Sequence, residues 1–195
     1  MFSVNIDKLT KMTDKEAASY EEVAETLLDM CMDQCKSIAV VGEPRSAFKL
    51  AATVAKMDKK IFFVDADVSS EIFLSKYRLG KNLKGFTDYI TGGASVRELK
   101  CVTNRDDVTI MFTGNIEGVG DIHKYGKRIT ALLVEALDDY DMVIVASDME
   151  GDVASYCGGT VLIMKGSEYT EDIARHCVDG LDTNGCSVLG VVIDE

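Results

Sequence analysis

The chain has 195 residues, of which 47% are apolar and 28% charged, and its formal net charge is −12. This length and balance are typical of one globular domain with a substantial core. The negative charge argues against binding to nucleic acid or to an anionic membrane surface. We therefore expect a single domain over residues 1–195, in which residues 1–18 form an irregular N-terminal segment.

No apolar run approaches the roughly 20 residues that a membrane-crossing helix needs. The first 16 residues, MFSVNIDKLTKMTDKE, lack the apolar stretch of a secretory signal. These features predict a cytoplasmic protein without direct membrane insertion. The six cysteines form no CxxC motif, so buried thiols are the simplest interpretation; Cys31 and Cys35, on one helical face, leave a metal or redox pair open.

Short runs rich in Val and Ile alternate with helical patterns along the chain. The runs are typical of strands buried on both faces, as central parallel strands are. The helical patterns place apolar residues on one stripe, and the last of them offers Ser167 or Thr170 as its N-cap. In chain order, we predict a helix over 19–35, strands over 38–41, 61–64 and 108–112, a helix over 127–140, strands over 142–145 and 161–164, a helix over 167–185 and a strand over 188–193.

Strands that alternate with helices predict a mostly parallel β-sheet, flanked by helices on both faces. Ligands bind such sheets beyond the carboxyl ends of the strands. Three strand ends carry polar residues there: Gly42–Ser46 with the alanine-rich helix behind it, Asp65–Asp67, and Ala146–Asp148. We therefore expect any ligand site to lie at this edge of the sheet.

Four segments resemble, in order and spacing, the cytoplasmic bacterial tyrosine kinases of capsular exopolysaccharide synthesis, which are related to the septum-site and plasmid-partition ATPases. The segments are KKIFFVDADVSS, GFTDYITGGASVREL, YDMVIVASD and VLGVVIDE, and the resemblance runs from about Ser19 to the C-terminus. It implies the fold of P-loop NTPases, in which three layers are stacked as α/β/α. It also implies a phosphate-binding loop after the first strand, a magnesium-binding aspartate after the second, and a Walker B aspartate.

The residues at the phosphate-binding loop depart from that family. The candidate cofactor-binding segment is Gly42, Glu43, Pro44, Arg45 and Ser46, a degenerate Walker A loop that is about two residues short. A phosphate cradle needs several inward-pointing amides, glycines and a lysine. Here Pro44 removes one amide donor, Arg45 takes the place of the lysine, and Ser46 survives as a candidate magnesium ligand.

The acidic motifs are only partly kept. Ala146 stands where the family has its Walker B carboxylate, and Asp148, two residues later, is a weaker candidate metal ligand. Asp65 and Asp67 are candidate ligands of a residual magnesium site. The alternative is that these two carboxylates only cap the following segment, because a metal site without a triphosphate partner has lost most of its charge.

Two features of the family that serve phosphorylation are also altered. The ring-forming ExxRxxR pattern aligns with Glu22, Glu25 and Leu28. Replacing its arginines by an acid and a leucine removes the attraction between subunits, so we expect no ring of the kinase type. The sequence stops after its final strand, at Glu195, and its seven tyrosines are scattered rather than clustered in a tail.

The first interpretation is a catalytically inactive relative, a pseudokinase that acts through protein binding or regulation in exopolysaccharide biosynthesis or export. On this interpretation the protein has no catalytic residue and needs no cofactor. Its partner is a membrane adaptor or an active paralogue, which could recruit the chain to the membrane. The second is a divergent nucleotide-binding ATPase or tyrosine kinase that retains ATP or ADP and magnesium. A third is a site for another small anion at Arg45 and Lys49, although Lys49 is expected on the solvated side of its helix.

Overall fold

A computed structural model describes residues 3–31, 35–69, 83–117 and 119–194. Its described residues form an eight-stranded sheet in the order β1-β4-β5-β3-β6-β2-β7-β8. The strands are β1 (Ser3–Val4), β2 (Ser37–Val41), β3 (Ile61–Asp65), β4 (Cys101–Thr103), β5 (Val108–Met111), β6 (Met142–Ser147), β7 (Gly159–Lys165) and β8 (Val188–Asp194). The helices are α1 (Asp14–Cys31), α2 (Pro44–Ala55), α4 (Phe86–Ile90), α5 (Val96–Leu99), α6 (Gly126–Leu137) and α7 (Glu171–Thr183), with single 3₁₀ turns η1 (Ile122–Tyr125) and η2 (Ala154–Tyr156).

The mostly parallel sheet is confirmed, and the six predicted strands all form. Every neighbouring pair is parallel except β4 and β5, which run antiparallel. The prediction that each strand is buried on both faces is right for β3, β5 and β6. It is wrong for β8, whose residues are half-buried or exposed because it is the last strand of the sheet.

The N-terminal segment is more ordered than the sequence suggested. Helix α1 begins at Asp14, so residues 14–18 are helical rather than irregular. Thr13 and Glu16 cap this helix reciprocally: the Glu16 amide donates to Thr13 Oγ1 over 3.2 Å, and the Thr13 amide donates to Glu16 Oε2 over 2.7 Å. Thr170 caps α7 as predicted, accepting the Ile173 amide over 3.2 Å.

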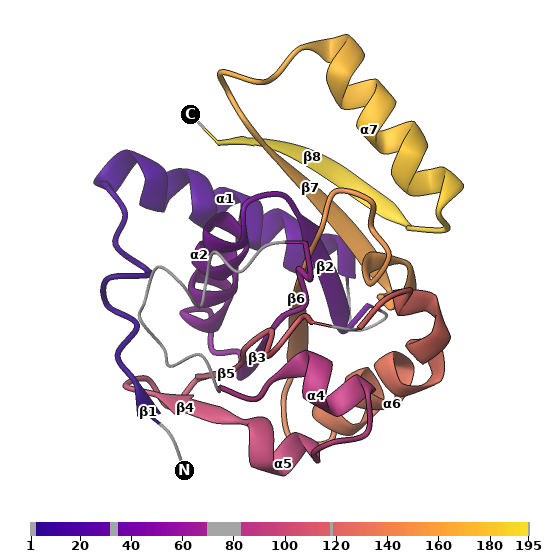
Figure 1. Cartoon of the computed structure of the whole chain (residues 1–195). Helices are drawn as coiled ribbons and strands as arrows, with labels where there is room; N and C mark the ends of the chain where they lie inside the picture. The colour runs from indigo at the N-terminus through magenta and orange to yellow at the C-terminus, as the bar shows by residue number, and fades with distance from the viewer. Residues whose placement is uncertain (1–2, 32–34, 70–82, 118, 195) are drawn as a thin grey trace.

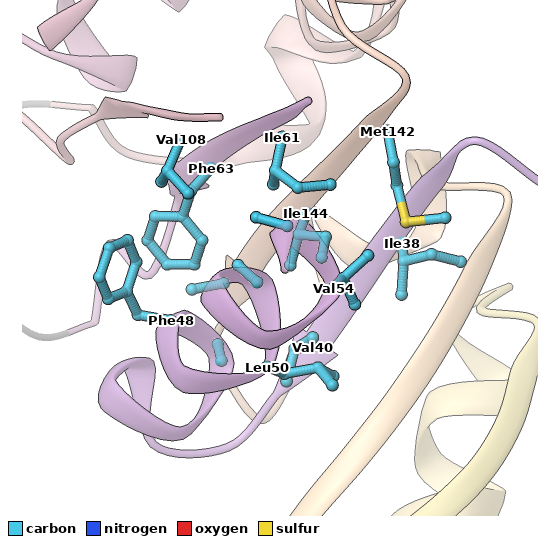
Figure 2. Packing of buried hydrophobic residues seen from close by; sticks show 14 of the residues in the cluster. Ile38, Val40, Phe48, Leu50, Val54, Ile61, Phe63, Val108, Met142 and Ile144 are labelled. Carbon is cyan, nitrogen blue, oxygen red and sulfur yellow. The ribbon is translucent and has the colours of Figure 1, made fainter. Parts of the chain in front are cut away.

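Helices cover both faces of the sheet, which confirms the three-layer arrangement (Figure 1). One apolar cluster joins α1 and α2 to the sheet, and two others join α4, α5, α6 and α7 to its opposite face. Figure 2 shows the first cluster, in which α2 lies over the central strands. Its aromatic centre is the edge-to-face pair of Phe48 and Phe63, whose ring centroids are 4.9 Å apart.

Candidate functional site

The turn after β2 contains only Gly42 and Glu43, because β2 ends at Val41 and α2 begins at Pro44. Gly42 has φ +137°, and a Cβ there would lie 2.4 Å from the Ile163 carbonyl oxygen, so the position requires glycine. The carboxylate of Glu43 faces Lys165 Nζ at 3.9 Å. The chain therefore passes from strand to helix almost directly.

Few amides at the start of α2 are free to meet an anion. Pro44 has none, and the amides of Ser46 and Ala47 both donate to the Glu43 carbonyl, over 2.9 and 3.2 Å. These are the ordinary bonds of a first helical turn. A cradle of the P-loop kind needs several amides that point at the ligand instead.

Ser46, the candidate magnesium ligand, is buried and its hydroxyl is engaged elsewhere. Its Oγ donates to Asp194 Oδ2 over 2.8 Å, and the Tyr20 hydroxyl donates to the same oxygen over 3.1 Å. These bonds join α2 to α1 and to the end of β8. The hydroxyl of Ser46 thus has a structural partner within the chain.

The expectation for Lys49 was wrong, because its side chain is buried rather than solvated. Its Nζ lies 2.9 Å from Glu16 Oε1 and 5.5 Å from the centre of the Tyr20 ring. The Thr13 amide and then the Lys49 ammonium lower the pKa of Glu16 to about 2. Since Lys49 is paired with Glu16, the small-anion interpretation loses one of its two basic residues.

Arg45 lies in the first turn of α2, at the carboxyl edge of the sheet, and is half-buried. Its Nε is buried and has no hydrogen-bond partner among the described residues. A buried donor of this kind is uncommon in folded proteins. Within the predicted segment, Arg45 is therefore a basic residue whose buried Nε the described structure leaves without a hydrogen-bond partner.

The carboxylates of Asp65 and Asp148 come from neighbouring strands, since Asp65 pairs in register with Ala146 of β6. Asp65 is 1% exposed. Its Oδ2 accepts the Thr113 hydroxyl over 2.6 Å, whereas its Oδ1 has no partner among the described residues. Burial raises the pKa of Asp65 to about 7. Asp148 accepts the Gly151 amide over 2.9 Å, and burial raises its pKa to about 6.

The negative charge of Asp67 acts on both of these carboxyl groups. Its Oδ1 accepts both the amide and the hydroxyl of Ser69, over 2.9 and 2.6 Å. Its negative charge contributes to the raised pKa of both Asp65 and Asp148. The three acids therefore lie near one another, but in the described part of the chain no group of three His, Cys, Asp or Glu residues could hold a metal ion. Magnesium ligation by this set stays a prediction.

Two further polar residues lie at the same edge, and the sequence analysis assigned neither of them a role. Thr113 holds Asp65, and the hydroxyl of Ser147, at the end of β6, is buried without a partner among the described residues. Thr113 directly follows the predicted run 108–112, and Ser147 lies two residues after the predicted run 142–145. Their position, rather than any motif, was the available signal.

The cysteine and ring patterns can also be placed. All six thiols are free, and Cys35 lies outside α1, beyond three residues that the structure does not describe. Glu22 and Glu25 are exposed on α1, and Leu28 is half-buried there. No helix in the described ranges is long and apolar enough to cross a membrane.

The chain is similar in sequence to several known proteins. No protein-family model matches the chain. It is 19% identical over 160 residues to the tyrosine-protein kinase CpsD of Streptococcus agalactiae, covering 79% of this chain and 70% of that protein. It is 22% identical over 206 residues to the tyrosine-protein kinase YwqD of Bacillus subtilis, with 97% and 85% covered. Over most of its length, the chain is thus similar in sequence to bacterial tyrosine kinases.

Solved structures agree with this relationship at the level of the fold. The kinase domain of the Escherichia coli tyrosine kinase ETK superposes with a TM-score of 0.80 at 18% identity, over 99% of this chain and 88% of that one. The septum site-determining protein MinD of Pyrococcus horikoshii, solved with Mg-ADP, gives a TM-score of 0.59 at 14% identity, over 81% and 69%. The chain thus has a P-loop NTPase fold, as its resemblance to the kinases implied.

Proposed function

We propose that the chain is a catalytically inactive relative of bacterial tyrosine kinases, which acts by binding another protein in exopolysaccharide biosynthesis or export. The partner would be a membrane adaptor or an active paralogue, and binding to it would recruit a cytoplasmic protein to the membrane. The observation that carries the proposal is the turn between β2 and α2, which has two residues.

That turn supports the proposal because phosphate binding depends on amides and a lysine held around the anion. Between Gly42 and Ala47, one residue lacks an amide hydrogen and two amides bond the Glu43 carbonyl. The lysine of the motif is replaced by Arg45, whose planar guanidinium does not substitute for a threaded ammonium. A triphosphate would find few donors in this segment.

The acidic groups support it as well. Ala146 stands in the place of the Walker B carboxylate, so one acidic ligand of the family's magnesium site is missing. Magnesium is usually held by one or two carboxylates together with substrate phosphates. Without the phosphate cradle, the remaining acids lack that second set of ligands.

Titration with MgATP and with MgADP tests the proposal by calorimetry and by thermal unfolding. We expect no binding heat and no change in melting temperature at millimolar nucleotide. Saturation to 100 times Kd would stabilise the fold by about 2.7 kcal/mol, which is roughly 5–11 °C for a chain of this size. A shift of that size refutes the proposal, and the YwqD kinase in the same buffer serves as the positive control.

One observation favours the second candidate, a divergent nucleotide-binding ATPase or tyrosine kinase. Arg45 Nε and Asp65 Oδ1 are both buried without partners in the described residues, as groups kept for a ligand would be. On this interpretation Arg45→Ala and Asp65→Ala weaken nucleotide affinity, whereas Arg175→Ala on the exposed face of α7 does not. Equal affinity in all three variants would remove the site from consideration.

A further inference from the structure

The outer edge of β8 is open in the described part of the chain, since β8 is the last strand in the sheet order. The Asp194 carbonyl accepts the Gly166 amide over 2.8 Å and therefore points toward β7. Because alternate residues of a strand direct their backbone groups to alternate edges, Val191 and Ile193 present their N–H and C=O groups outward. The strand contains no lysine or proline, the usual protection of an exposed edge.

The side chains of this edge are apolar on both faces of the sheet. Val191 and Ile193 pair in register with Leu162 and Met164 of β7, and they are 38% and 44% exposed. On the opposite face, Leu189 and Val192 pack partly buried against the cluster that contains α1 and α2. An added strand would therefore find apolar surface on each side of it.

A hollow lies between α1 and β8 on the second of these faces. It has a volume of about 250 Å³, and its apolar lining includes Val23, Leu27, Leu189 and Val192. We call this the α1–β8 groove. It shares Val23 and Val192 with a second hollow of about 530 Å³ that reaches Asp194. Together they have the size of a site for several side chains of a bound peptide.

The negative charge around the groove favours a basic segment over a second copy of this chain. Helix α1 carries six carboxylates and one lysine, and Glu22, Glu25 and Asp29 follow one another along its exposed face, where Glu22 also lines the groove. Helix α7, on the other face, carries four carboxylates and one arginine. A second copy of this chain would bring like charges together, which disfavours self-association. A basic segment meets no such repulsion.

We propose that the β8 edge and the α1–β8 groove bind an extended segment of a partner protein in which apolar residues alternate with lysine or arginine. Its main chain pairs with Val191 and Ile193. Its apolar side chains point to one face of the sheet and cover Val191 and Ile193 there, whereas its basic side chains point to the other face. On that face their alkyl stems lie along the apolar groove and their charged ends meet the carboxylates of α1. This is strand addition, in which backbone bonds supply affinity and alternate side chains supply specificity. The inference goes beyond the proposed loss of catalysis and does not depend on it, because the α1–β8 groove shares no residue with the Gly42–Ser46 segment or with the three acids of the candidate site.

Fluorescence anisotropy with a labelled ten-residue peptide of alternating valine and lysine tests the charge requirement, without nucleotide. We expect saturable binding that weakens with salt, and binding at least about tenfold weaker for the valine–glutamate analogue. The double variant Glu22→Lys with Glu25→Lys should lose about tenfold in affinity. The matched control, Glu135→Lys on α6 with Asp138→Lys at the C-cap of that helix, has the same spacing and should retain it. Equal loss in both variants would show only non-specific attraction and overturn the proposal.

Two substitutions at Val191 test the strand pairing. Val191→Pro removes the outward amide and should abolish binding, and circular dichroism checks that the variant is folded. Val191→Lys keeps the amide and adds a charge that repels the basic peptide, so it should also weaken binding, whereas Val134→Lys on the exposed face of α6 should not. Unchanged affinity in a folded Val191 variant refutes strand addition. A dimer in sedimentation that Val191→Lys dissociates would identify a second copy as the occupant and also refute the proposal.

Discussion

Replacing Asp65 by asparagine should remove a large part of the pH dependence of folding stability. The carboxyl group is 1% exposed, and burial raises its pKa from 3.8 to about 7. The unfolded chain therefore releases this proton near pH 4, whereas the folded chain keeps it until about pH 7. Between these values the folded state binds more protons, so the free energy of unfolding falls as pH rises.

The magnitude follows from the two pKa values. At 1.36 kcal/mol per pH unit, the native protein loses about 3 kcal/mol between pH 4.5 and pH 8 through Asp65 alone. Asparagine has no such titration, and its amide oxygen can still accept the Thr113 hydroxyl, which lies 2.6 Å from Asp65 Oδ2. The amide group of the variant changes the free energy of unfolding by the same amount at both pH values. The test therefore compares how much the free energy of unfolding of each protein changes between pH 4.5 and pH 8.

Urea and thermal unfolding of both proteins in EDTA, at pH 4.5 and pH 8, measure that difference. We expect the variant to gain about 3 kcal/mol relative to the native protein on going to pH 8, or roughly 6–12 °C in melting temperature. Asp148 titrates in both proteins and cancels. The matched control is Asp172→Asn, the same substitution at an exposed position on α7, and the change of the pH profile in Asp65→Asn should exceed the change in this control. Parallel profiles for native protein and Asp65→Asn would refute the buried neutral carboxyl.

Three further substitutions follow, each measured by urea unfolding. Glu16→Gln removes the charged partner of buried Lys49 and should cost about 2 kcal/mol at pH 7; because the pKa of Glu16 is about 2, the difference from native should shrink as pH falls from 4 toward 2. Gly42→Ala places a Cβ 2.4 Å from the Ile163 carbonyl oxygen at φ +137°, and should cost about 3 kcal/mol. Phe48→Ala leaves a cavity in the core shown in Figure 2 and should lower the free energy of unfolding by about 3–5 kcal/mol. A loss below about 1 kcal/mol would contradict the respective argument.

The central sheet could be predicted because its strands are short apolar runs whose composition is itself the signal. β1 and β4 could not, since they have two and three residues. The two strands pair with each other across about a hundred positions. Strands this short gain their stability from pairing, which a local pattern does not contain. The exposure of β8 was missed for the same reason: its valines match a central strand, and only the sheet order reveals that it lies at an edge.

At the candidate site, the strand ends were predictable and the partners of their side chains were not. Ser46 was predicted as a candidate magnesium ligand and Lys49 as a residue on the solvated side of its helix. In the structure Ser46 bonds Asp194, 148 positions away, and Lys49 bonds Glu16, 33 positions away. Long-range partners of this kind depend on the packing of α1 and β8 against α2. No spacing rule within the loop contains that information.

The candidate site residues therefore fall into two groups, which differ in whether the described structure gives their side chains a hydrogen-bond partner. Ser46 and Lys49 have structural partners, so replacing either should lower stability and leave any nucleotide affinity unchanged once the protein is folded. Arg45 Nε and Asp65 Oδ1 lack partners in the described residues, so replacing Arg45 or Asp65 should affect ligand affinity wherever a ligand exists. Stability and nucleotide titration of the four single variants therefore discriminate the two candidate functions. An affinity that falls with Ser46→Ala as much as with Arg45→Ala would mean that the bond to Asp194 opens when nucleotide binds, and the inactive assignment would fail with it.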